Sequence, residues 1–193
     1  MKKIISVILI IACACMLFAC GANAKDFKAA MDNTAPERIV INTKTVSVGL
    51  GELEGTYSVT YNEDGSAVIK YTYEKWNTIS TDGSPISPDA KSNASGTVTK
   101  NADGTYTDPD FTGGAEVAVL SLNLDAISKG YTVSEDGSTL SATVIKGNTE
   151  AVFGTAFGYD VQLKIVKGVS AIESISLEYV NGNDTVYIDC VYY

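Results

Sequence analysis

The sequence predicts a mainly β domain: a single curved antiparallel sheet, as in a half-barrel or open barrel, with a few short helices. Strand-length segments alternate between apolar and polar residues, glycine-containing turns separate them, and the helical segments are short. Strands with one apolar face exclude a parallel sheet that is covered on both faces. We therefore expect the sheet to curl over its own apolar face.

A short helix and a long hairpin open the predicted domain. Residues 26–31 predict a helix that ends before Pro36. Apolar and polar residues alternate over residues 53–61, and the alternation resumes over residues 67–74 after a glycine-containing turn at residues 62–65. These two segments predict a β-hairpin with one apolar and one solvated face.

Later segments repeat this pattern. Turn motifs recur at residues 101–104, 135–137 and 181–182, each beside strand-like sequence. Four further segments place apolar residues at every second position: Leu140, Ala142 and Val144; Val161, Leu163 and Ile165; Ile175, Leu177 and Tyr179; Val186, Ile188 and Cys190. The pattern indicates a series of antiparallel strands.

Two stretches interrupt the alternation. Residues 77–95 are rich in Ser, Pro and Asp and predict a long loop, either a binding loop or a mobile linker, with the linker favoured. Residues 118–128 fit a strand or a helix, and we expect a strand start followed by a helical turn at residues 124–129. The glycines at 113–114 and 147–154 match no phosphate-binding pattern and predict turns.

The N-terminus is typical of an exported protein. Lys2 and Lys3 precede an apolar run that is shorter than the ~20 residues of a membrane-spanning helix. The run ends at Leu17-Phe18-Ala19-Cys20-Gly21, which resembles the lipobox of bacterial lipoproteins. In that family the cysteine thiol is alkylated with diacylglycerol and the chain is cleaved just before it.

The lipobox resemblance implies three segments and a location. Residues 1–19 are then a lipoprotein signal peptide, residues 20–25 a lipidated tether beginning at Cys20, and residues 26–193 an antiparallel β domain. Acyl chains such as palmitate would hold the domain outside the cytoplasm, at the bacterial cell membrane. The alternative is that Cys20 is one more cysteine of a cysteine-rich apolar run.

The composition excludes several functions. The chain has 14 basic and 23 acidic residues, and removal of Lys2 and Lys3 with the signal leaves 12 basic residues and a formal charge of −11. With Arg38 as the single arginine, such a chain is not expected to bind nucleic acid or to attach to lipid through basic residues. No histidine is present, which excludes Ser-His-Asp and Cys-His catalysis. Cys190 is in phase with apolar neighbours, and we expect a buried thiol rather than a nucleophile.

The order of the elements is a leading helix, a long hairpin, an irregular centre and a run of closing strands. It resembles the lipoprotein-carrier superfamily typified by LolA and LolB and by the mycobacterial lipoprotein carriers. The resemblance spans residues 27–193 and implies an apolar cavity, under helical lids, that binds acyl chains or another amphiphile. Five tyrosines in the apolar phase are the candidate ligand-binding residues: Tyr57, Tyr61, Tyr71, Tyr73 and Tyr179. Packing of these rings across the strands as ordinary core is the favoured alternative.

Two clusters of acidic residues are weaker candidates. A calcium site could use Asp103, Asp108 and Asp110, although their spacing matches no EF-hand loop. Glycoside hydrolysis could use Glu54, Glu74 or Glu116, but the first two lie in the polar phase of their strands. No catalytic, metal or cofactor site is predicted. We therefore expect a non-enzymatic, membrane-anchored protein that binds or carries an amphiphile at the cell envelope. The alternative is a structural or carbohydrate-contacting surface lipoprotein without an internal ligand cavity.

Overall fold

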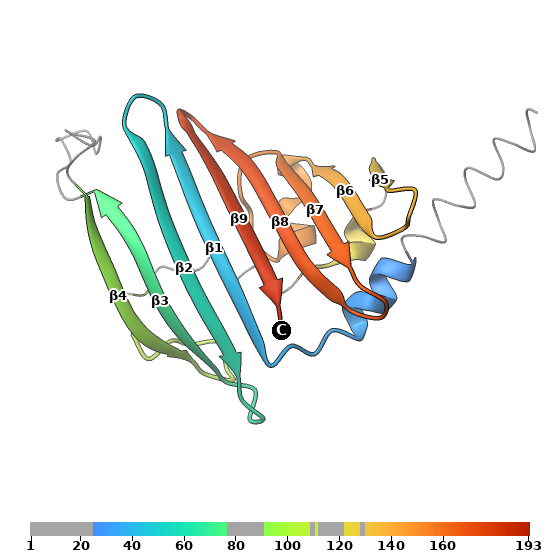
Figure 1. Ribbon diagram of the computed structural model, residues 1–193, viewed down its shortest axis with the longest axis horizontal. Coiled ribbons are helices and arrows are strands. Elements are labelled where there is room, and N and C mark those ends of the chain that lie inside the picture. Colours follow the sequence, from blue (N-terminus) through green and yellow to red (C-terminus); the bar gives the residue numbers. More distant parts are fainter. Residues whose placement is uncertain (1–24, 77–90, 109–110, 112–121, 128–129) are drawn as a thin grey trace, which may run out of the picture.

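The computed structural model describes residues 25–76, 91–108, 111, 122–127 and 130–193. Nine strands form one sheet in the order β4-β3-β2-β1-β9-β8-β7-β6-β5, and every pairing is antiparallel (Figure 1). Their bounds are β1 Arg38–Ser47, β2 Gly51–Tyr61, β3 Ala67–Trp76, β4 Lys91–Lys100, β5 Tyr131–Val133, β6 Thr139–Val144, β7 Val161–Lys167, β8 Ile172–Asn181 and β9 Asp184–Tyr192. Strands β4 and β5 are the two ends of this order, so the sheet is open rather than a closed barrel.

Two meanders make up the sheet. Strands β1 to β4 follow one another along the chain and in space, and so do β5 to β9. The last strand, β9, pairs with β1 from Ile39↔Tyr192 to Ser47↔Asp184, and this pairing joins the two halves. The fold is therefore complete only when the C-terminal strand lies between β1 and β8.

The strand register separates an apolar inner face from a polar outer face. One inner row runs across six strands and is buried throughout: Leu140, Ile165, Ile175, Cys190, Ile41 and Tyr57. Successive side chains of a strand point to opposite faces, so the residues next to these in each strand lie on the outer face. Most of the outer-face residues are hydrophilic. The prediction of a mainly β fold on a single open antiparallel sheet is confirmed.

Short helical pieces lie behind the sheet in Figure 1, over the half formed by β5 to β9. They are helical residues 25–32, η2 Leu124–Ala126, η3 Lys146–Asn148 and α3 Thr149–Phe153. Phe27 of the first helix and Phe153 of α3 are fully buried. Thr34 fixes the end of the first helix, since its hydroxyl donates to the Ala30 carbonyl (2.6 Å) and accepts from the Ile172 amide of β8 (2.9 Å). These pieces cover part of the inner face.

Three turns share one construction. The carboxylates of Asp64, Asp103 and Asp136 each accept from the backbone amide and the hydroxyl of the residue two positions later. Each aspartate precedes a glycine with positive φ, between +70° and +87°. The predicted turns at these positions are confirmed, and in each the side chain completes the turn.

Three segments differ from the sequence-based expectation. Strand β1 was not predicted, because Val40 and Val46 place apolar residues on its outer face and obscure the alternation. The polar stretch assigned to a loop over residues 77–95 ends earlier, since strand β4 begins at Lys91. Residues 147–154, interpreted as turns, contain α3, whose C-cap is Gly154 at φ +71°. The other part of the loop, residues 77–90, lies outside the described residues.

Candidate functional site

A cavity of about 630 Å³ lies on the inner face, at the end of the sheet where β1 begins and β2 and β9 end. Its walls come from the first helix and the segment after it, from three strands, and from the start of the segment 122–127. The described lining residues are Met31, Thr34, Ala35, Pro36, Ile39, Tyr61, Leu122 and Tyr192. Most of this lining is apolar, as expected for a small-molecule pocket of ordinary size.

Backbone pairing fixes the strand side of the cavity. Ile39 is buried, and it lies opposite Val59 of β2 and Tyr192 of β9. The Tyr61 amide donates to the Glu37 carbonyl at 3.2 Å, which closes the corner between β2 and the start of β1. Tyr61 and Tyr192 therefore lie on the two strands that flank Ile39, both on the inner face.

Both tyrosines are neutral at physiological pH. Burial raises the pKa of Tyr61 to about 12, and burial also raises the pKa of Tyr192. Tyr61 keeps 38% of its surface exposed, so its side chain reaches from the apolar interior to solvent. None of the described lining residues carries a charge. The cavity can thus hold an apolar chain and offer phenol hydroxyls to a polar group.

The structure distributes the five predicted tyrosines over three places. Tyr61 lines the cavity. Tyr57, Tyr71 and Tyr73 form one aromatic cluster, with ring centroids 5.8 to 6.5 Å apart. Tyr179 belongs to a second cluster, 5.4 Å from Phe157 and 5.8 Å from Tyr159. The assignment of all five to a ligand site stays a prediction, and the structure brings only Tyr61 to the large inner cavity.

The first cluster packs over glycines. Tyr71 lies opposite Gly96 of β4 and Tyr73 opposite Gly55 of β2. A Cβ at position 96 would come within 2.6 Å of the Tyr71 hydroxyl oxygen, and one at position 55 within 3.1 Å of the Tyr73 Cβ. Aromatic rings over glycine in this way stabilise strand pairing, most of all at an edge strand such as β4.

The remaining cavity residues were not predicted as a site. They come from positions 31 to 39, 122 and 192, which are far apart in the sequence. The available signal was local: Tyr192 continues the apolar phase of Val186, Ile188 and Cys190. Cys190 itself is fully buried, as predicted.

Two of the acidic candidates, Asp103 and Glu74, have structural roles in the described residues. The Asp103 carboxylate is bound within its own turn, and the hydrogen bonds from Thr105 lower its pKa. Glu74 accepts from the Glu54 amide at 3.0 Å and lies 3.4 Å from the Lys91 ammonium. Asp110 and Glu116 lie outside the described residues. No group of three His, Cys, Asp or Glu side chains suitable for a metal occurs in the described part of the chain.

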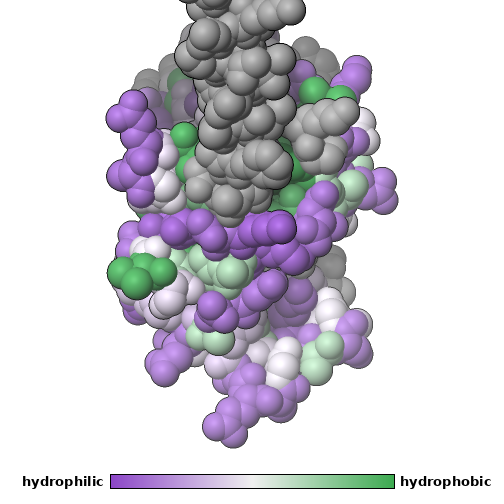
Figure 2. Space-filling view, turned by 90° about the vertical axis from the view of Figure 1, so that its right-hand side faces the viewer, coloured by the Kyte–Doolittle hydropathy of each residue, from purple (hydrophilic) through white to green (hydrophobic). Residues whose placement is uncertain are grey.

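The surface at the end that carries the first helix is mostly hydrophilic, with smaller hydrophobic patches (Figure 2). None of the helices in the described ranges has the length and hydropathy of a membrane-spanning segment. The fold and the cavity together define the protein as an open antiparallel sheet that carries an apolar pocket on its inner face.

Comparison with known proteins gives a likeness in structure and none in sequence. No protein-family model and no curated protein matches the sequence. Among solved structures, the chain is similar to a LolA superfamily protein from Nitrosomonas europaea, over 88% of this chain and 90% of that chain, with 8% identity and a TM-score of 0.34.

Proposed function

We propose that this protein is a non-enzymatic, lipid-anchored protein of the bacterial cell envelope that binds an amphiphile in the inner-face cavity. The observation that carries the proposal is the cavity itself: about 630 Å³, mostly apolar walls, and two neutral tyrosines. A solvent-open apolar cavity on the inner face favours this function over a purely structural or carbohydrate-contacting surface protein, for which none is needed.

The chemistry of the walls selects the ligand class. Met31, Ile39 and Leu122 offer dispersion contacts but no hydrogen-bond donors from their side chains. Each methylene that leaves water contributes about 0.8 kcal/mol, so ten methylenes contribute on the order of 8 kcal/mol before the cost of immobilisation. The hydroxyls of Tyr61 and Tyr192 suit an uncharged or weakly polar headgroup region. A ligand with one acyl chain meets these requirements.

The proposed anchor places the cavity close to a source of such ligands. Cys20 precedes the first helical residue, Lys25, by five positions, and an extended tether of that length spans at most about 18 Å. Met31 at the end of this helix is part of the cavity wall. Acyl chains on Cys20 would therefore keep the cavity near the membrane surface, where amphiphiles are concentrated.

The ligand experiment uses the full chain purified from native membranes. Solvent extraction and mass spectrometry should recover a stoichiometric amphiphile in addition to the acyl groups on the protein. Ala35 lies exposed at the cavity, and Ala35→Trp should fill the entrance and reduce the bound amphiphile at least tenfold. Ala29→Trp is the matched control, because Ala29 is exposed on the preceding helix but does not line the cavity. Equal ligand content in the two variants, or no ligand in the unmodified protein, contradicts the proposal.

The anchor has a separate experiment. Cells that express the Cys20→Ser chain and are fed labelled palmitate should show no label on the protein. The Cys15→Ser chain is the control and should be labelled like the original. Label that persists on the Cys20→Ser chain would refute lipidation at this residue but would leave ligand binding in the cavity untouched.

A further inference from the structure

The outer face of the sheet carries a second concavity, independent of the inner cavity. A shallow groove of about 460 Å³ crosses strands β5 to β9, and a second of about 340 Å³ crosses β9, β1 and β2. Tyr187 and Asp189 line both, so the two form one continuous groove over seven strands. At ~4.8 Å between strands, its length is about 29 Å. We call it the outer groove.

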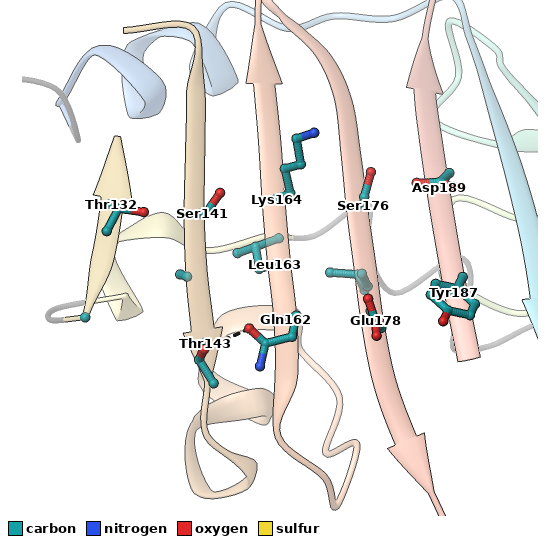
Figure 3. A pocket seen from close by; sticks show the side chains of 13 residues that line it. Thr132, Ser141, Thr143, Gln162, Leu163, Lys164, Ser176, Glu178, Tyr187 and Asp189 are labelled. Carbon is teal, nitrogen blue, oxygen red and sulfur yellow. Dashed lines mark hydrogen bonds between the residues drawn. The ribbon is translucent and has the colours of Figure 1, made fainter. Parts of the chain in front are cut away.

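The register places one polar side chain from each of six strands along the outer groove. Six neighbouring strands contribute Ser141, Lys164, Ser176, Asp189, Asn42 and Thr56, each directly opposite the next. Figure 3 shows the first four of them on adjacent strands, with Gln162, Glu178 and Tyr187 in the row beside them. This row of hydroxyl, ammonium, carboxylate and amide groups runs perpendicular to the strands.

Most of these groups make few contacts with one another. Thr143 donates to Gln162 at 2.9 Å, and Thr56 donates to Asn42 at 3.1 Å. Within the described residues, Ser141, Lys164, Ser176, Glu178 and Asp189 make no side-chain hydrogen bond or ion pair. Lys164 and Asp189 are two strands apart, about 10 Å at the usual spacing, which is too far for an ion pair. Their hydrogen-bonding capacity is available to a ligand.

The charge of the groove restricts the ligand. Lys164 stands with Glu54, Glu178 and Asp189 along the groove, whereas Lys44 forms an ion pair with Glu52, which lines neither pocket. The groove therefore carries charges of both signs, with carboxylates in excess. A polyanion would meet these three carboxylates on an acidic protein, and a polycation would meet the unpaired ammonium group of Lys164. A neutral ligand that both donates and accepts hydrogen bonds complements the groove best.

Among neutral polymers the geometry favours a sugar chain over a peptide. An extended peptide adds to a free strand edge through its backbone, but β6 to β9 and β1 are paired on both sides. The outer groove thus offers side chains rather than backbone. Tyr187, 36% exposed, adds a ring on which the C–H face of a pyranose can stack, and sugar hydroxyls suit the surrounding carboxylate, amide and hydroxyl groups. We infer that the outer groove binds a neutral oligosaccharide of several residues, laid across the strands.

The test uses the full chain in phosphatidylcholine nanodiscs and titrates it with oligosaccharides of four to six residues. The panel holds neutral glucan oligomers, N-acetylglucosamine oligomers and anionic galacturonate oligomers. We expect at least one neutral oligomer to bind, and the anionic oligomers to bind at least tenfold more weakly. Tyr187→Ala and Asp189→Ala should each weaken the binding of the neutral oligomer tenfold or more.

Matched controls separate the groove from the rest of the surface. Lys70→Ala changes an exposed residue on the outer face of β3 that lines neither groove, and should leave binding within twofold. Ser141→Trp should block the groove, whereas Thr97→Trp on β4 should not. Melting temperatures of all variants report whether they fold. Binding to no neutral oligomer, preference for galacturonate, or equal losses in groove and control variants would overturn the inference. Ala35→Trp should not affect sugar binding, so the amphiphile and sugar proposals fail separately.

Discussion

Substitution of Gly96 by alanine tests whether the tyrosine cluster is fixed by packing. Gly96 lies on the edge strand β4, opposite Tyr71. A Cβ there would lie 2.6 Å from the hydroxyl oxygen, 2.8 Å from Cζ and 3.2 Å from Cε1 of Tyr71. The ring has little room to move, because Tyr73 and Phe111 lie 5.8 and 5.3 Å away between centroids. The methyl group must therefore displace a packed ring.

The expected magnitude follows from two opposing effects. Overpacking of this kind costs about 1–3 kcal/mol. Replacing glycine by alanine in a strand recovers up to about 1 kcal/mol by restricting the unfolded chain. Gly96→Ala should therefore lower the free energy of unfolding by about 1–2 kcal/mol. For a domain of this size, that lowers the melting temperature by about 2–8 °C.

Urea denaturation of four chains measures the effect: the original, Gly96→Ala, Tyr71→Ala and the double variant. In the Tyr71→Ala background the added methyl group meets no ring, so Gly96→Ala should be neutral or stabilising there, with a coupling of about 1–2 kcal/mol. Gly147→Ala is the control, because Gly147 has open space around its Cβ position and no positive φ. A Gly96→Ala penalty of equal size in both backgrounds would refute the reasoning. The Tyr71 ring would then be free to move and remain a candidate for ligand contact.

Three further predictions concern pH and the helix. Hydrogen bonds from Ser134 and Ser138 hold the pKa of Asp136 at about 2, against about 3.9 in an unfolded chain, so its contribution to stability is present above pH 4 and lost as the pH falls towards 2. Asp136→Asn should thus flatten the acid side of a urea-midpoint profile, and an unchanged profile would contradict this. Burial raises the pKa of Tyr61 from 10 to about 12, so its contribution is present below pH 10 and lost as the pH rises through 12. Tyr61→Phe should reduce the alkaline loss of stability, and an equally steep loss would show that Tyr61 is not its source. Thr34→Val leaves the Ile172 amide without its acceptor at a cost of about 1–3 kcal/mol, and hydrogen exchange should show faster exchange at Ile172 and in residues 25–32; unchanged protection would contradict the role of Thr34.

The alternation of residues predicted the fold class and most strands. Where every second residue is apolar, as in β7 and β9, the buried positions of the structure match the predicted face. Strand β4 escaped prediction because Lys91–Lys100 has one large apolar residue, Val98, and is otherwise small or polar. Its inner face is covered by a ring from the next strand, as at Gly96. A strand that is completed by its neighbour leaves little signal in its own sequence.

Strand β1 shows a different reason for failure. Ile39 and Ile41 are buried on the inner face, but Val40 on the outer face is also half-buried. β1 is central and pairs over most of its length with β2 and β9. Central strands are shielded by neighbours on both sides, so apolar residues on the outer face cost little there. The pattern of apolar residues in β1 therefore depends on the position of this strand in the sheet, which its local sequence does not reveal.

The candidate cavity depends still more on topology. Its walls join Met31 and Ile39 near the beginning of the domain to Tyr61, Leu122 and, near the C-terminus, Tyr192. These residues meet because β9 pairs with β1, so that Tyr192 lies opposite Ile39. A tyrosine in the apolar phase of its strand can thus lie in one of two environments. In the interior of a strand, as at Tyr57, it stacks against cross-strand neighbours and is buried. At the end of a strand, as at Tyr61, it has fewer neighbours and can line a cavity, so position along the strand is the better guide to a binding residue.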